Sequence, residues 1–183
     1  MWVGGTSGLV RAGADGLLLR VLAECESAVP PWLDDLEDTG AVVIVHLRTP
    51  GGVEEAVRRG IGLHLPSAMD PRPWRGRVRG LLGQSCHDIE ELRRAARVCD
   101  YATLSPVWMP RSKPLLQGQQ ALGPQGLARL ANQVGIPVLA MGGVGPARVA
   151  ACLAGGAWGV AGIGAFGEAD TLAAMAAELD PVG

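Results

Sequence analysis

The sequence lacks closely spaced cysteines. Cysteine pairs separated by two residues are the usual signature of a zinc site or a redox motif. No such pair occurs among the four cysteines, which are Cys25, Cys86, Cys99 and Cys152. Most of them stand in apolar or helical contexts. We therefore expect reduced cysteines that pack in the interior, and neither a disulfide framework nor a zinc site.

Long apolar runs and an excess of basic charge are also missing. No run reaches the length of a membrane span, and residues 1–4 lack the basic start of a signal peptide. The formal net charge is −2 and the pI is about 5.9, with arginines scattered among acidic residues. These features exclude a membrane protein and provide no nucleic-acid surface. We expect a cytoplasmic protein that binds neither membrane nor nucleic acid.

Aromatic residues are scarce, with five tryptophans but one phenylalanine and one tyrosine. Trp108 lies in a long predicted loop, where its ring could stack on a ligand. Core packing is the more usual role of a tryptophan. The sequence leaves both roles open.

What the sequence does contain is a buried strand, a glycine turn and a helix near its C-terminus. An apolar run, residues 137–141, is closed by Gly142 and Gly143, and residues 146–156 have proline at the start of a helical pattern and glycine at its end. Because glycine has no Cβ, backbone N–H groups can approach an anion closely beside a helix start. The glycines could instead serve only tight strand-to-helix packing, and this turn alone does not separate the two interpretations.

A second glycine-rich strand, residues 158–167, follows one helix later. The C-terminal ends of adjacent parallel strands lie side by side, so the turns at Gly142–Gly143 and at Ile163–Gly164 should face one pocket. In a (β/α)₈ barrel the loops after strands 7 and 8 form the usual phosphate site. We therefore predict that these two turns bind phosphate.

The rest of the chain supplies the other elements of such a barrel. Apolar runs alternate with helical patterns, and the expected strands are residues 2–6, 17–21, 41–47, 61–65, 78–84, 100–104, 137–141 and 158–167. Eight alternations predict an α/β fold, a (β/α)₈ TIM barrel, rather than an open sheet. We expect a single domain over residues 1–183, with shortened N-terminal helices because the chain is short for a barrel.

Polar residues near the ends of the predicted strands are candidates for a functional site. Arg20 ends the second strand, and His87 follows the fifth, where it could transfer protons or cap the next helix. His64, between two leucines on a strand, is expected to be a packing residue with satisfied hydrogen bonds. The loop over residues 105–123 carries Arg111 and Lys113. Opposite two glycine turns, these cations favour anion binding.

Taken together, these motifs resemble the superfamily of thiamine-phosphate synthases and TenI-type thiazole tautomerases. The matching segments, in the order and spacing of the superfamily, are residues 62–65, 85–88, 105–114, 142–144 and 162–164. The resemblance covers essentially the whole chain, is close from about residue 80 to residue 167, and is weak before residue 60. It implies a diverged (β/α)₈ transferase of thiamine biosynthesis, which joins a pyrimidine methyl diphosphate to a thiazole phosphate and releases pyrophosphate.

The resemblance also implies the roles of individual residues. Ser85 and Lys113 would contact the pyrimidine diphosphate, and Arg20 matches the arginine at the end of strand two; with His87 they form the predicted catalytic set. The residues expected along the thiazole phosphate are Pro110, Arg111, Ser112, Gly142, Gly143, Ile163 and Gly164. The reaction develops a benzyl-like cation and a leaving polyanion, so cations and hydroxyl donors are suitable residue types.

The chain departs from the superfamily at the metal site. Residues 48–50 stand where the synthase has an Asn-Asp pair that binds magnesium. Met69 stands where a second carboxylate is expected, and Asp70 comes one position later. Asp70 is the one candidate ligand, so Mg²⁺ lacks its usual oxygen ligands.

Three functions therefore remain open from the sequence. The first is the synthase. The second is a tautomerase that uses His87 or His64, because the histidine of that group aligns with Pro106. The third is a protein that binds thiazole phosphate or thiamine phosphate without catalysis. The expected partners are small phosphorylated heterocyclic substrates, and a homo-oligomer stays open.

Overall fold

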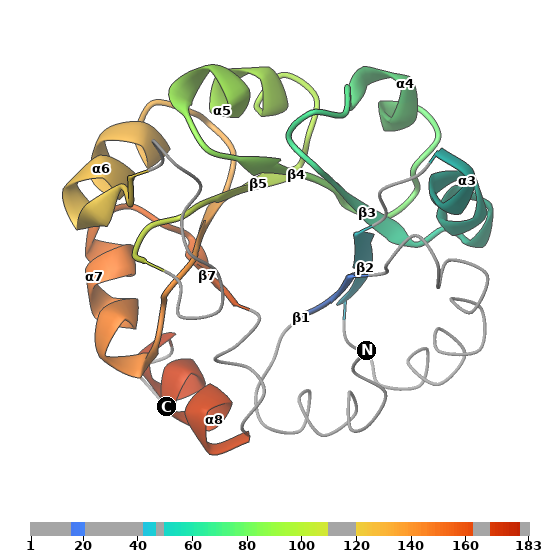
Figure 1. Cartoon of the computed structure of the whole chain (residues 1–183). Coiled ribbons are helices and arrows are strands. Elements are labelled where there is room, and N and C mark those ends of the chain that lie inside the picture. The colour runs from blue at the N-terminus through green and yellow to red at the C-terminus, as the bar shows by residue number, and fades with distance from the viewer. Residues whose placement is uncertain (1–15, 21–41, 47–49, 110–119, 163–168, 180–183) are drawn as a thin grey trace.

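The computed structural model describes residues 16–20, 42–46, 50–109, 120–162 and 169–179 of the chain. In these residues all strands belong to one sheet, and each strand runs parallel to its neighbours in chain order. The strands are β1 (Gly16–Arg20), β2 (Val42–His46), β3 (Gly62–Leu65), β4 (Leu82–Cys86), β5 (Tyr101–Leu104), β6 (Val138–Met141) and β7 (Gly159–Ala161). The sheet curves around a common centre (Figure 1).

The helices lie on the outer side of this curved sheet (Figure 1). They are α3 (Pro50–Arg59), α4 (Arg72–Arg75), α5 (Ile89–Ala95), α6 (Gly123–Ala131), the 3₁₀ turn η2 (Pro146–Arg148), α7 (Val149–Ala154) and α8 (Ala169–Leu179). None of the described helices is long and apolar enough to cross a membrane. The predicted parallel α/β architecture is confirmed. The predicted strand over residues 2–6 and the helices before residue 40 lie outside the described residues.

Several predicted element boundaries were wrong, among them the end of the strand expected over residues 158–167, which stops at Ala161. The strand expected over residues 78–84 begins only at Leu82, because the N–H of Val78 still donates to the carbonyl of Trp74 at the end of α4. The helix expected over residues 146–156 is divided into η2 and α7. Proline at position 146 is compatible with either kind of helical turn, so the local sequence did not reveal this division.

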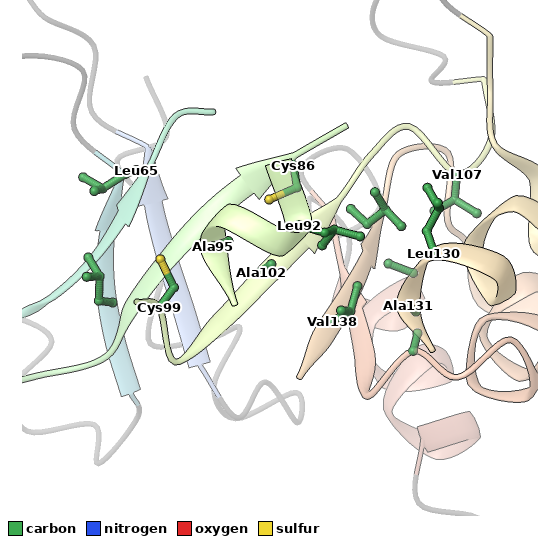
Figure 2. Packing of buried hydrophobic residues seen from close by; sticks show 14 of the residues in the cluster. Leu65, Cys86, Leu92, Ala95, Cys99, Ala102, Val107, Leu130, Ala131 and Val138 are labelled. Carbon is green, nitrogen blue, oxygen red and sulfur yellow. The ribbon is translucent and has the colours of Figure 1, made fainter. Parts of the chain in front are cut away.

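The hydrophobic core lies between the sheet and the helices. Successive residues of β3 point to opposite faces of the sheet, and Leu63 and Leu65, which share the outer face, are fully buried. Figure 2 shows Cys86 and Ala102 of the sheet near Leu92 of α5, and all three belong to one buried cluster. The three described cysteines are buried free thiols, which confirms their predicted packing role.

The inner face of the sheet is tightly packed where β4 meets β5. Gly83 pairs with Tyr101, and a Cβ atom at position 83 would lie only 2.6 Å from Tyr101 Oη and would overlap the ring itself. The absence of a side chain at Gly83 therefore makes room for the Tyr101 ring.

We expect Gly83→Ala to lower the free energy of unfolding by about 1–3 kcal/mol, because the added methyl group would displace the buried ring. Gly76→Ala is the matched control, since position 76 has open space and a negative φ of −79°. Chemical denaturation followed by circular dichroism measures both variants. Equal midpoints for the two would contradict this account of the interior.

Candidate functional site

The loop after β5 joins the C-terminal ends of β4 and β6. The Ser105 N–H donates to the carbonyl of Cys86 at 3.0 Å, and the Val107 N–H donates to the carbonyl of Met141 at 2.9 Å. The Trp108 N–H donates to the carbonyl of Gly142 at 3.0 Å. Backbone hydrogen bonds therefore hold three strand ends together at one edge of the sheet, which is where parallel α/β proteins place their sites.

Gly142 and Gly143 allow this loop to approach the turn after β6. Their φ angles are +94° and +62°, a region that residues with a side chain rarely adopt. A Cβ at Gly142 would lie 2.9 Å from Pro106 Cα, and one at Gly143 would lie 2.7 Å from the Met109 carbonyl oxygen. The two glycines thus allow tight packing of the turn against the loop after β5, which differs from the strand-to-helix packing considered from the sequence, and anion binding stays a prediction.

The strands that lead into the two predicted phosphate turns are neighbours. β6 and β7 are parallel, and Met141 pairs with Ala161 at their C-terminal ends. Ile163 and Gly164 come two and three positions after Ala161 in the sequence and lie outside the described residues. The two chain segments that lead into the turns therefore leave the sheet at the same level.

Ser85 is connected to a buried histidine. Its Oγ lies 2.9 Å from His64 Nε2, and His64 Nδ1 lies 2.9 Å from the hydroxyl oxygen of Tyr101. Thr103 Oγ1 is 3.4 Å from the same Nε2. These side chains form a polar chain across the inner faces of β3, β4 and β5. The prediction that His64 is a packing residue with satisfied hydrogen bonds is confirmed.

The surroundings of His64 keep its ring neutral. Burial, and secondly the nearby His46 ring at a centroid distance of 5.4 Å, lower the pKa of His64 to about 3. Burial also raises the pKa of Tyr101, so its phenol keeps its proton. A histidine with such a low pKa is a poor proton acceptor near pH 7, so His64 is better suited to orienting Ser85 than to catalysing proton transfer.

His87 lies at the same strand ends and is exposed. Its Nδ1 is 2.7 Å from the carbonyl oxygen of Ser105. A carbonyl oxygen only accepts, so Nδ1 carries the hydrogen and the neutral ring keeps Nε2 as an acceptor. The cap of α5 is formed by Asp88, whose Oδ1 accepts from the Glu91 N–H at 2.8 Å. Because another residue caps the helix, the His87 ring is not needed for that role.

Asp70 does not fit a magnesium site. Both of its carboxylate oxygens accept hydrogen bonds from Arg72, whose Nη2 lies 2.8 Å from Oδ2, and this partner lowers the pKa of Asp70. The pair lines a surface groove of about 520 Å³ together with Arg94 and Arg97. The described segments contain no group of three or more His, Cys, Asp or Glu residues that could hold a metal ion.

The remaining predicted site residues are only partly placed. Arg20 is the last residue of β1 and pairs with His46, which in turn pairs with His64. The backbone of Arg20 therefore lies in the same row of the sheet as the polar chain. The predicted residues outside the described segments are Pro110, Arg111, Ser112, Lys113, Ile163 and Gly164.

The sequence analysis missed residues that contact His64 and the glycine turn. Tyr101 and Thr103 were counted only as part of a strand, and Arg148 was not considered as a site residue. An available signal was the alternation of polar and apolar residues in β5, in which Tyr101 and Thr103 alternate with Ala102 and Leu104.

The sequence comparisons with known proteins agree on one family. A sequence profile described as thiamine monophosphate synthase matches residues 37–166. The thiamine biosynthesis bifunctional protein ThiM/ThiE of Symbiobacterium thermophilum is 35% identical over 149 residues, which are 78% of this chain and 30% of that protein. The thiamine-phosphate synthase of Chloroflexus aurantiacus is 34% identical over 100 residues, which are 54% of this chain and 45% of that protein. The chain thus spans about half or less of the length of these relatives.

A solved structure shows the same architecture. Thiamine phosphate pyrophosphorylase from Pyrococcus furiosus superposes with a TM-score of 0.76 at 19% identity, covering 96% of this chain and 90% of that chain. At this level of identity the likeness concerns the fold alone.

We expect acid to destabilise the protein through His64. An unfolded histidine has a pKa near 6.5, whereas in the folded protein the pKa of His64 is about 3. Below the unfolded pKa, the unfolded chain binds a proton that the folded chain does not. The free energy of unfolding should therefore fall by about 1.4 kcal/mol per pH unit between about pH 6 and pH 4 because of this group.

Denaturation of the wild type and of His64→Gln across this pH range isolates the contribution of His64 to the pH dependence of the free energy of unfolding. The substitution lowers stability at every pH but removes the titrating group, so its stability should depend less steeply on pH. Identical pH slopes for the two proteins would show that His64 is protonated when folded.

Proposed function

Because the chain belongs to the thiamine monophosphate synthase family, we propose that it joins a pyrimidine methyl diphosphate to a thiazole phosphate and releases pyrophosphate. The observation that carries this proposal is the loop after β5, which brings Ser85, His87 and the Gly142–Gly143 turn to one edge of the sheet. At Ser85 and the glycine turn the sequence predicted contacts with phosphorylated substrates, and at His87 it predicted proton transfer or a helix cap.

We also propose that the complete fold is a closed (β/α)₈ barrel and a single domain over residues 1–183. The seven described strands follow one another in chain order with helices outside, and residues 2–6 would supply the eighth strand. The likeness to a solved structure over 96% of the chain supports this proposal. A homo-oligomer and a cytoplasmic location stay predictions.

In the proposed reaction the thiazole ring nitrogen forms a bond to the methylene carbon of the pyrimidine. The bond from that carbon to the diphosphate oxygen breaks, and pyrophosphate leaves with the electron pair. Catalysis then depends on alignment of the two substrates and on stabilisation of the leaving group's charge. Ser85, Arg111 and Lys113 are the proposed donors to phosphate oxygens, with Arg20 at the end of β1.

The buried polar chain can set the direction of the Ser85 hydroxyl. If the protonated phenol of Tyr101 donates to His64 Nδ1, the neutral ring carries its hydrogen on Nε2 and donates it to Ser85 Oγ. The Ser85 hydroxyl then has its own hydrogen free to donate to the diphosphate. The described residues do not fit Mg²⁺, so no step of this proposal depends on a metal ion.

A second function is favoured by the geometry of His87. Thiazole tautomerisation moves a proton between two atoms of the substrate, which requires one group that can accept and return it. The contact of Nδ1 with the Ser105 carbonyl leaves Nε2 of His87 as that acceptor at the exposed strand ends. His64 is less suitable, because its pKa is about 3.

Purified protein supplied with both substrates should form thiamine phosphate and pyrophosphate, measured by chromatography. Ser85→Ala should lower kcat about a hundredfold, since it removes a donor to the leaving group. Tyr101→Phe should lower kcat by a smaller factor, because it removes only the group that orients His64. Unfolding midpoints verify that both variants are folded. If the protein binds thiazole phosphate but forms no product, it is a non-catalytic binding protein. If it neither binds thiazole phosphate nor forms product, the proposal is rejected.

For the tautomerase alternative, we expect His87→Ala to slow tautomer conversion at least about a hundredfold, because the proton acceptor is lost. His87→Gln is a useful companion, since its side chain can donate a hydrogen bond but does not titrate. Conversion is followed by nuclear magnetic resonance of the thiazole. Unchanged conversion in both variants would exclude His87 from the proton transfer.

A further inference from the structure

Arg148 connects the glycine turn after β6 with the loop after β5. It is the last residue of η2, and its Nη1 donates to the carbonyl oxygen of Gly143 at 2.6 Å. Its guanidinium carbon lies 5.1 Å from the centroid of the Trp108 ring, which is a cation–π distance. Arg148 therefore bridges the two segments whose backbones are already hydrogen-bonded to each other.

The contacts of Trp108 and Arg148 fix two consecutive peptide groups. The Trp108 N–H holds the carbonyl of Gly142, and Arg148 holds the carbonyl of Gly143. In a trans peptide group the C=O and the N–H that follows it point in opposite directions. The N–H groups of Gly143 and Val144 therefore point away from Trp108 and Arg148.

These two N–H groups have no acceptor among the described residues. Neither donates a hydrogen bond to another described residue, and Val144 as a residue is 6% exposed. The φ angles of Gly142 and Gly143 in this turn are both positive, at +94° and +62°. Consecutive N–H groups in a turn of this kind can form a concave anion site. No carboxylate of the described residues forms an ion pair with Arg148, so among these residues its guanidinium is engaged by the Gly143 carbonyl and the Trp108 ring.

We propose that Arg148 is a positioning residue of the anion site. It holds the Gly143 carbonyl while its guanidinium lies against Trp108, and this directs the N–H groups of Gly143 and Val144 at the ligand's phosphate. An arginine suits this position because a planar guanidinium can donate a hydrogen bond and stack on an aromatic ring at the same time. The inference rests on the proposed function, since it concerns the same site, and it adds Arg148 and the Val144 N–H to it.

A double-mutant cycle tests the inference through binding of thiazole phosphate, measured by isothermal titration calorimetry on the intact protein. We expect Kd to rise about tenfold in Arg148→Gln, which loses the stacked cation, and about fivefold in Trp108→Leu, which removes its support. The double variant should bind no more than about twofold more weakly than Arg148→Gln, because both residues act through one bridge. Arg129→Gln, an exposed arginine at the end of α6, is the matched control and should bind like the wild type.

The same thiazole without its phosphate provides a second readout. Its affinity should be equal in the wild type and in Arg148→Gln, because the two N–H groups face the phosphate. Two results would overturn the positioning role: an unchanged Kd for thiazole phosphate in Trp108→Leu, or additive losses of affinity in the double variant. Either result would mean that Arg148 acts on the ligand without the bridge to Trp108. An unchanged Kd in Arg148→Gln would overturn the inference alone. A wild type that binds no thiazole phosphate would reject the proposed function together with the inference.

Discussion

The contact between the loop after β5 and the turn after β6 determines how the strand ends are arranged in this protein. Two backbone hydrogen bonds, from Val107 to Met141 and from Trp108 to Gly142, bring the segments together. This approach is possible because Gly142 and Gly143 have no side chains and adopt positive φ angles. The same two glycines that permit the packing also leave backbone N–H groups uncovered by any side chain of their own. Packing and anion binding are therefore compatible roles of one turn.

The polar chain inside the sheet obeys a second constraint, which is that buried polar groups need hydrogen-bond partners. His64 has a partner on each ring nitrogen, and its burial keeps it neutral. Moving a charged imidazolium into this position would be costly, so the ring cannot act as a proton store near neutral pH. The hydrogen bond with Tyr101 holds the His64 ring in one orientation, and the ring in this orientation contacts Ser85. His87, on the exposed side of the same strand ends, has the solvent access that His64 lacks.

Charges on the described part of this edge are arranged differently from a magnesium site. Asp70 is neutralised by Arg72, whereas Arg148 lies beside the glycine turn and forms no ion pair with a described carboxylate. In the proposed site an anion would interact with the backbone N–H groups that Arg148 positions rather than with a metal ion. Such donors recognise a phosphate through direct hydrogen bonds. This arrangement agrees with a site for phosphorylated ligands that departs from the family at its metal ligands.

The sequence by itself determined the type and order of the described elements and the burial of His64 between two leucines. These features follow from hydrophobic periodicity and from turn and capping residues, which act over a few neighbouring positions. The tertiary structure decided where β4 begins, how η2 and α7 divide one predicted helix, and which side chains meet. His64 finds Tyr101 and Ser85, and Arg148 finds Trp108, only because strand register brings distant residues together. Register depends on the packing of the whole sheet, which no local pattern specifies.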